Sequence, residues 1–198
     1  MTRSAAGTGL LAILAEISGA SLTLNELAET RAGLLRQVFP AVAVTRFDAA
    51  QIDDHLDPSI RPTVVLMNPP FSVLANVQGC RSDATPRHIA SALARLEPGG
   101  HLVAITGADF APDAPAWTET FARLQEIGRV VFSAAVDGAV FAKHGTSFET
   151  RLPVIDKLAA DDPAQFPASP GVAPDVATLI GWIEAHVPPR AGSVAQIG

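Results

Sequence analysis

The chain alternates between two hydrophobic periods. Short runs of β-branched and apolar residues, typical of buried strands, lie at 20–24, 42–48, 63–67, 101–106, 129–133 and 147–155. Segments with apolar residues on one helical face lie between most of these runs, at 10–18, 27–38, 86–96 and 117–127. Strands that alternate with amphipathic helices predict an α/β domain built on a mostly parallel sheet.

The run at 63–67 is followed directly by Asn68-Pro69-Pro70-Phe71. Two consecutive prolines fix φ at about −65° and end the hydrogen-bond ladder of a strand. The Asn68 side chain is therefore expected at the carboxyl end of that strand, with the Phe71 ring next to it. Because open α/β sheets bind their ligands at this edge, we interpret Asn68, Pro69, Pro70 and Phe71 as a catalytic motif.

The chemistry of this motif suits a substrate with an amino group on a flat ring or amide. Such a nitrogen is a poor nucleophile because its lone pair is delocalised. The Asn68 oxygen and the carbonyl of the following proline can accept both N–H hydrogens and draw the lone pair out of conjugation. Phe71 can stack on the flat group. The alternative is a strand that ends in a Pro-Pro turn, with Phe71 in the core.

Two further patterns point to a nucleoside cofactor. The segment 4–14 predicts a glycine-containing loop that opens a helix, and Gly7 and Gly9 allow a ligand to approach the backbone closely. Glu26 follows a short strand about 20 residues later, the spacing of an acid that binds ribose hydroxyls. Small-residue turns before helices are also common, and Glu26 could instead cap the helix 27–38.

Three basic residues are candidates for contact with the acceptor: Arg81, Lys143 and His144. Arg81 lies in the polar loop 72–87 beside the Asn68 motif, where Arg81, Arg87 and the adjacent His88 could contact phosphate, although surface solvation is the simpler role for any one of them. Lys143 and His144 lie in the link between the last two predicted strands, which faces the same edge of the sheet. No spacing of ligands in the chain suggests a metal site.

Composition bounds the class of protein. A length of 198 residues with 48% hydrophobic and 17% charged residues fits one α/β domain with a sizeable core. No apolar stretch reaches membrane-spanning length, Met1-Thr2-Arg3 begins no signal-like region, and the single Cys80 excludes an internal disulfide, so a cytoplasmic location is expected. The net charge of −6 predicts that a neighbouring domain or chain supplies most of any nucleic-acid affinity.

The carboxyl-terminal part differs in composition. Residues 159–174 contain four prolines and are interpreted as a linker after a domain at 1–158. A short amphipathic helix at 175–187 and a tail to residue 198 follow it. We interpret this end as leading toward a further domain.

The order of these features resembles class I methyltransferases, which have a Rossmann-like three-layer α/β sandwich with an antiparallel closing strand and use S-adenosylmethionine. Asn68-Pro69-Pro70-Phe71 resembles the Asn/Asp-Pro-Pro-aromatic motif of the amino-directed members. The resemblance covers roughly residues 4 to 157 and implies roles for eight further residues. The residues that it assigns to cofactor binding are Ala6, Gly7, Thr8, Gly9, Glu26, Leu27, Asp48 and Ala49.

More narrowly, the segments 66–71 and 144–157 are similar to the methylase part of bacterial methylase/helicase fusions related to strawberry notch. This resemblance implies methyl transfer to adenine N6 in DNA, with a helicase-like domain or chain as partner. Other acceptors remain open: guanine N2 or adenine N6 in RNA, or a glutamine amide in a protein. A non-catalytic interaction module also remains open.

One departure from the family stands at the start of the chain. The family's glycine loop follows a first strand that ends in Asp/Glu-Pro, whereas Arg3 and Ser4 stand in those places. Because the residues before Ala6 are fewer than a typical strand with its lead-in, we expect the first strand to be truncated and the middle of the sheet to be missing or supplied by something else.

Overall fold

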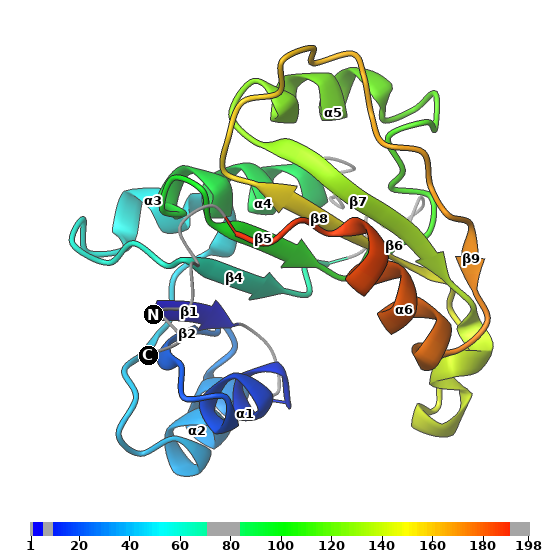
Figure 1. The fold of residues 1–198 in the computed structure, drawn as a ribbon. Helices are drawn as coiled ribbons and strands as arrows, with labels where there is room; N and C mark the ends of the chain where they lie inside the picture. Colours follow the sequence, from blue (N-terminus) through cyan, green and yellow to red (C-terminus); the bar gives the residue numbers. More distant parts are fainter. Residues whose placement is uncertain (1, 6–9, 71–83, 191–198) are drawn as a thin grey trace, which may run out of the picture.

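The computed structural model describes residues 2–5, 10–70 and 84–190, and shows one twisted sheet with helices on both faces (Figure 1). Its strands are β1 (Thr2–Ala5), β2 (Ser21–Asn25), β3 (Val44–Thr45), β4 (Val64–Met67), β5 (His101–Ala104), β6 (Thr106–Gly107), β7 (Arg129–Val136), β8 (Thr150–Asp156) and β9 (Val172–Ala173). The order in the sheet is β3-β2-β1-β4-β5-β8-β7-β9, and β6 pairs with β8.

The direction of the strands confirms the predicted sheet. Neighbouring strands from β3 to β5 are parallel, and β8 lies antiparallel between β5 and β7. The carboxyl ends of β2, β3 and β4 therefore meet at one edge. β7 points the same way as β4, because each of the two steps from β5 through β8 to β7 reverses direction.

The first strand is present at the centre of the sheet. Thr2–Ala5 pairs with β2 on one side and with β4 on the other, and Arg3 lies opposite both Leu22 and Val64. The prediction that the middle strand would be missing or supplied by something else is therefore wrong. The strand has four residues, fewer than the five or six that are typical, but two flanking strands offer it hydrogen-bond partners.

The helices fall between the strands, as the periodicity predicted. They are α1 (Leu10–Ile17), α2 (Glu29–Val38), α3 (Ile52–His55), α4 (Ala84–Arg95), α5 (Thr118–Gln125) and α6 (Val176–His186), with 3-10 helices η1 (Ala49–Gln51) and η2 (Gly138–His144). The largest core cluster packs α4 and α5 onto the sheet through fully buried Ile89, Leu93 and Phe121. A second cluster joins α1 and α2 to β2 around Leu24 and Leu35.

The segment 159–174, predicted as a linker, packs against the domain. The fully buried Gln125 side chain donates to the carbonyls of Pro163 and Gln165, at 3.0 and 2.8 Å. Phe166 packs on the main core, and β9 adds a strand next to β7. Prolines remove backbone donors but leave carbonyl acceptors, so a Pro-rich segment can still be held by a donor from the core.

Helix α6 also packs on the sheet instead of standing apart from it. Leu179, Trp182 and Ile183 cover the buried side chains of Phe132 and Val154, on the face opposite α4 and α5 (Figure 1). Asp175 caps the helix by accepting a hydrogen bond from the Thr178 backbone at 2.7 Å. None of the described helices is long and apolar enough to cross a membrane.

Candidate functional site

A cavity open to solvent lies at the carboxyl ends of β2, β3 and β4, with a volume of about 500 Å³. The predicted site residues that line it are Glu26, Leu27, Asp48, Ala49, Asn68, Pro69 and Pro70. They come from three segments far apart in the sequence, and the parallel sheet brings them to one place. Ala6, Gly7, Thr8, Gly9, Phe71 and Arg81 lie outside the described residues, so their roles stay predictions.

Glu26 follows β2 and is buried, with only 6% of its surface exposed. Its Oε1 accepts hydrogen bonds from the Ala28 backbone at 2.8 Å and from the Arg31 guanidinium at 2.9 Å. Burial raises the pKa of Glu26, but these two bonds and the charge of Arg31 together outweigh it and lower the pKa below its usual value. Glu26 is therefore ionised at neutral pH, and Oε2 accepts no hydrogen bond from the described residues.

Asn25, the last residue of β2, fixes the chain on the other side of this acid. Its Nδ2 donates to the Phe47 carbonyl at 3.0 Å, while its Oδ1 accepts from the Phe47 backbone and from Thr45 Oγ1, both at 2.9 Å. The side chain is buried. These bonds hold the segment after β3 against β2, which sets the position of Asp48 relative to Glu26.

Asp48 does not end a long strand, because only Val44 and Thr45 of the apolar run 42–48 pair with β2. Instead its Oδ1 accepts from the Ala50 backbone at 2.9 Å and caps η1. His88 of α4 approaches the same oxygen, with Nε2 at 3.9 Å. Burial lowers the pKa of His88, Asp48 opposes this shift, and Arg87 adds to it; the net pKa lies below its usual value.

The Asn68 motif is anchored by the helix that follows it. Thr85 Oγ1, in the first turn of α4, donates to the Pro70 carbonyl at 2.8 Å. Pro69 is buried, whereas the side chain of Asn68 is exposed at the cavity. An amide oxygen at a strand end and open to a cavity can accept hydrogen bonds from a ligand's amino group.

Lys143 and His144 end the 3-10 helix η2, which follows β7. Because β7 runs in the same direction as β4, their backbone lies at the same edge of the sheet as Asn68. Their side chains are outside the described part of the structure, so contact with an acceptor stays a prediction.

Sequence reasoning missed four residues of the cavity wall: Asn25, Arg31, Phe47 and Met67. His88 was considered only as a phosphate contact. Asn25 could have been found from the sequence, because it is a polar residue directly before the strand-end acid Glu26. Arg31 lies in α2, five residues after Glu26, which precedes that helix. The spacing rules for side-chain pairs apply within one helix, so they did not predict this ion pair.

No protein-family model matches the chain, and no curated protein is similar to it in sequence. Solved structures are similar in fold. A modification subunit of a putative type I restriction enzyme from Vibrio vulnificus has a TM-score of 0.61 at 14% identity, over 79% of this chain and 40% of that one. A putative class I S-adenosylmethionine-dependent methyltransferase from Listeria monocytogenes has a TM-score of 0.65 at 12% identity, over 92% and 63%.

A putative RNA methyltransferase from Pyrococcus horikoshii has a TM-score of 0.57 at 16% identity, over 79% of this chain and 74% of that one. The chain spans less than two thirds of the Vibrio and Listeria proteins. At these identities the likeness shows the fold: this chain has the Rossmann-like α/β fold of class I methyltransferases.

Proposed function

We propose that this domain transfers a methyl group from S-adenosylmethionine to an amino nitrogen, with adenine N6 in DNA as the acceptor. One observation carries the proposal: the Asn68-Pro69-Pro70 turn lines the same cavity as Glu26 and Asp48. A motif suited to an exocyclic amino group and two acids suited to a nucleoside thus share one site, in a fold whose solved neighbours include methyltransferases.

The described residues fit a nucleoside cofactor. Oε2 of Glu26 is available to ribose hydroxyls, because the described residues occupy only Oε1. The Asp48 side chain is 54% exposed at the cavity and can accept from the amino group of an adenine. Leu27 and Ala49 line the cavity beside these acids and offer apolar contact to the flat ring. The glycine loop at 6–9 would complete the site.

When bound, S-adenosylmethionine supplies an electrophilic methyl group on its sulfonium. The residues of this chain act on the acceptor. The Asn68 oxygen and the Pro69 carbonyl would accept the two N–H hydrogens of the amino group and draw its lone pair out of conjugation. The nitrogen would take the methyl group as the bond from sulfur to the methyl carbon breaks, the neutral thioether would leave, and the amino group would lose one proton to solvent. Catalysis then comes mainly from holding the nitrogen in line. For a base in duplex DNA the base must leave its stack to reach this turn.

DNA is the proposed acceptor because the motif resembles that of adenine methylases and because a restriction-modification subunit is among the neighbours in fold. RNA is the second candidate, favoured by the similarity to the putative RNA methyltransferase. Because the net charge is −6, we expect another domain or chain to provide much of the affinity for nucleic acid. A helicase-like partner in the cytoplasm would suit this role.

The test is methyl transfer from labelled S-adenosylmethionine to three acceptors: duplex DNA, single-stranded RNA and a protein with an exposed glutamine. Cofactor binding is measured separately by calorimetry on the same folded protein. Transfer to adenine in DNA supports the proposal, and transfer only to RNA or protein replaces its acceptor. A correctly folded chain that binds no cofactor would make the domain a non-catalytic module.

A further inference from the structure

Arg151 is a cation of the sheet that lies close to the Asn68 turn. It stands near the start of β8, where its backbone pairs with Thr106 of β6. The chain runs from β5 into β6 beside the end of β4, and the N–H of Ile105 donates to the Met67 carbonyl at 2.9 Å. Two steps of strand spacing, about 4.8 Å each, therefore place the Arg151 backbone roughly 10 Å from that of Asn68.

The cofactor cavity lies on the other side of Asn68. Its lining residues come from the segments 25–31, 47–49 and 67–70 and from His88 of α4. An acceptor nitrogen has to approach the methyl carbon from the side opposite to the donor sulfur. The acceptor side of the Asn68 turn is therefore the side of β5, β6 and β8, which continue the sheet beyond β4 (Figure 1). Arg151 lies on this side.

Two neutral acceptors hold the guanidinium of Arg151. Its Nε donates to the Ala108 carbonyl at 3.0 Å, and its Nη1 donates to Oγ of Ser133 at 3.2 Å. The remaining nitrogen, Nη2, has no acceptor among the described residues and is not fully buried. Because the other two nitrogens are fixed, the N–H groups of Nη2 are oriented before a ligand binds, which lowers the entropic cost of binding.

The charge of Arg151 is partly dehydrated. No carboxylate of the described residues forms an ion pair with it. Burial lowers the pKa of Arg151, and the exposed Asp113 opposes this only in part, from beyond ion-pair distance. The guanidinium is still charged at neutral pH. An anion that reaches Nη2 meets a fixed cation, and phosphate oxygens suit the planar guanidinium well.

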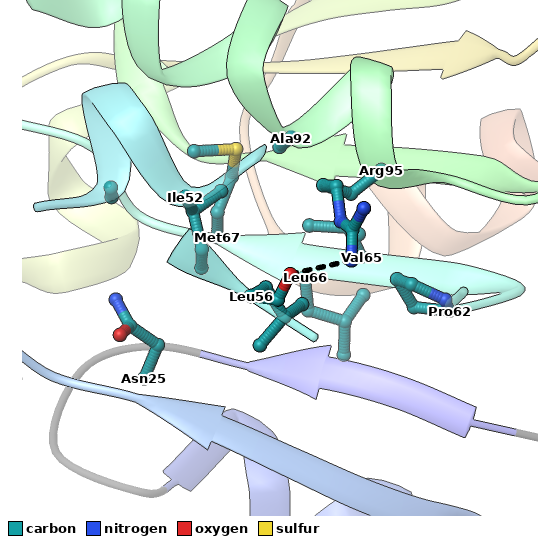
Figure 2. Close-up of a pocket in the computed structure, with 10 residues that line it drawn as sticks. Asn25, Ile52, Leu56, Pro62, Val65, Leu66, Met67, Ala92 and Arg95 are labelled. Carbon is teal, nitrogen blue, oxygen red and sulfur yellow. Dashed lines mark hydrogen bonds between the residues drawn. The ribbon is translucent and has the colours of Figure 1, made fainter. Parts of the chain in front are cut away.

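Three other arginines with described contacts lie elsewhere. Arg31 pairs with Glu26 on the cofactor side, and Arg46 pairs with Glu29. Figure 2 shows Arg95 toward the end of β4 away from Met67, where it donates to the Leu56 carbonyl. Of these four arginines, Arg151 is the one on the acceptor side of the Asn68 turn.

We propose that Arg151 binds a phosphate group of the acceptor, beside the amino group that Asn68 holds. This inference rests on the proposed methyl transfer, and it narrows the acceptor to a nucleotide in a nucleic acid strand, because a glutamine amide in a protein brings no phosphate. Contacts to phosphate carry little sequence information but fix the register of a strand. Arg151 would thus place the target base over the turn.

The test is a double-mutant cycle between Arg151 and the phosphates of a short single-stranded DNA with one adenine. Fluorescence anisotropy at low salt measures binding, so the readout does not require methyl transfer. A second oligonucleotide carries neutral methylphosphonates on both sides of the adenine. Arg151→Met should weaken binding of the first oligonucleotide about tenfold, the order of one charged hydrogen bond. It should leave binding of the second unchanged.

Two further variants separate the charge of Arg151 from its structural bonds. Arg151→Lys keeps a charge and should retain the salt dependence, whereas Arg151→Met should lower the slope of log K against log salt by about one. Ser133→Ala removes the acceptor of Nη1 and keeps the charge. It should preserve the difference in affinity between the two oligonucleotides.

The outcomes distinguish this inference from the proposed function. The expected coupling without any methyl transfer would keep Arg151 as a phosphate contact and remove the enzymatic proposal. Methyl transfer to adenine with an unchanged KM for the oligonucleotide in Arg151→Met would keep the enzyme and overturn the role of Arg151. An equal loss for both oligonucleotides would assign Arg151 a structural role only, and would overturn the inference too. So would equal or absent binding of both by the unaltered protein.

Discussion

At the scale of single residues, Asn68 and Glu26 have separate roles in the proposed reaction: Asn68 binds the acceptor and Glu26 binds the cofactor. Asn68 is exposed at the end of β4, where it can meet an acceptor, while Glu26 is buried and ionised beside Arg31. An exposed amide can be changed with little loss of packing. A buried acid in two hydrogen bonds is part of the wall that shapes the cavity. Substitutions at the two positions should therefore affect different steps.

Asn68→Ala should lower methyl transfer by about 100-fold or more, because it removes the acceptor that orients the amino group. Cofactor affinity should remain nearly unchanged, since the proposed cofactor contacts come from β2 and β3. Single-turnover transfer and calorimetric binding measure the two effects. Asn68→Asp keeps an acceptor oxygen and is the matched control, expected to retain part of the activity. Full turnover by Asn68→Ala would contradict the mechanism.

Glu26→Ala should have the reverse effect. A hydrogen bond to a charged group contributes about 1.5–3 kcal/mol, so the Kd for S-adenosylmethionine should rise roughly 10- to 150-fold while turnover at saturating cofactor persists. Glu119→Ala removes an exposed acid of α5, which pairs with Arg123, and serves as the control. An unchanged Kd for Glu26→Ala would remove this acid from the cofactor site.

The stability of the protein should fall in two pH windows. The folded-state pKa of His88 is lowered from its usual 6.5, so the unfolded chain binds the proton more readily and stability declines as pH drops below 6.5. The folded-state pKa of Glu26 is also lowered, so its contribution is complete above 4.5 and is lost as pH falls through the folded value. One proton sets a slope of at most about 1.4 kcal/mol per pH unit.

Urea unfolding from pH 8 down to pH 3 measures both slopes. His88→Gln should flatten only the upper window, and Glu26→Gln only the lower one. A variant of an exposed histidine, His186→Gln on α6, should leave both windows as they are. If His88→Gln preserves the full slope below pH 6.5, another group is responsible for it.

At the scale of elements, the sequence predicted the alternation of strands and helices and the edge at which Asn68 lies. The strand 63–67 and the helices near 86–96 and 117–127 were visible because their apolar periods are unbroken. The second β-strand and Glu26 were also found. The elements that sequence reasoning missed or misjudged are those whose structure depends on distant partners.

Three elements show this dependence. The strand at Thr2–Ala5 carries no apolar pattern and is fixed by pairing with β2 and β4. The run 42–48 looks like a full strand, but its pairing with β2 ends at Thr45. Beyond that point the Asn25 side chain, and not the β2 backbone, bonds the N–H and carbonyl of Phe47. The segment 159–174 looks like a linker, and its fixed position comes from Gln125, which lies about 40 residues earlier.

A turn glycine tests the tight packing at the opposite edge of the sheet. A Cβ added to Gly100 would lie 2.8 Å from the Thr63 carbonyl oxygen and 2.9 Å from that of Glu97, both in backbone. Gly100→Ala should therefore destabilise the fold by about 1–3 kcal/mol. Gly33→Ala in α2 meets nothing within 4 Å and should instead stabilise by about 0.5–1 kcal/mol. Urea unfolding of both variants checks the opposite signs.

At the scale of the whole molecule, the carboxyl-terminal segment belongs to the domain's packing. A chain that ends at residue 158 lacks β9 and α6 and uncovers Phe132 and Val154. We expect a lower Tm and a tendency to aggregate. Trp182→Ala is a smaller perturbation than the truncation. It should lower the free energy of unfolding by less than the roughly 3–5 kcal/mol lost when a fully buried aromatic is replaced by Ala, because Trp182 is half-buried. A truncated chain as stable as the full chain would restore the linker interpretation.

The four-residue strand β1 has a consequence for ligand binding. Among the described residues β2 and β4 do not pair with each other, so the sheet is joined at its centre through β1. Side chains of α4 also link the two halves: Ser91 binds Asp53, His88 approaches Asp48, and Arg95 donates to the carbonyls of Leu56 and Asp57. Glu26 and Asp48 belong to one half and Asn68 to the other. A ligand that contacts all three residues therefore connects the two halves of the sheet. Bound cofactor would then raise the free energy needed to separate the two halves of the sheet. Conversely, a substitution that strengthens the contact between the halves would raise the affinity for the cofactor.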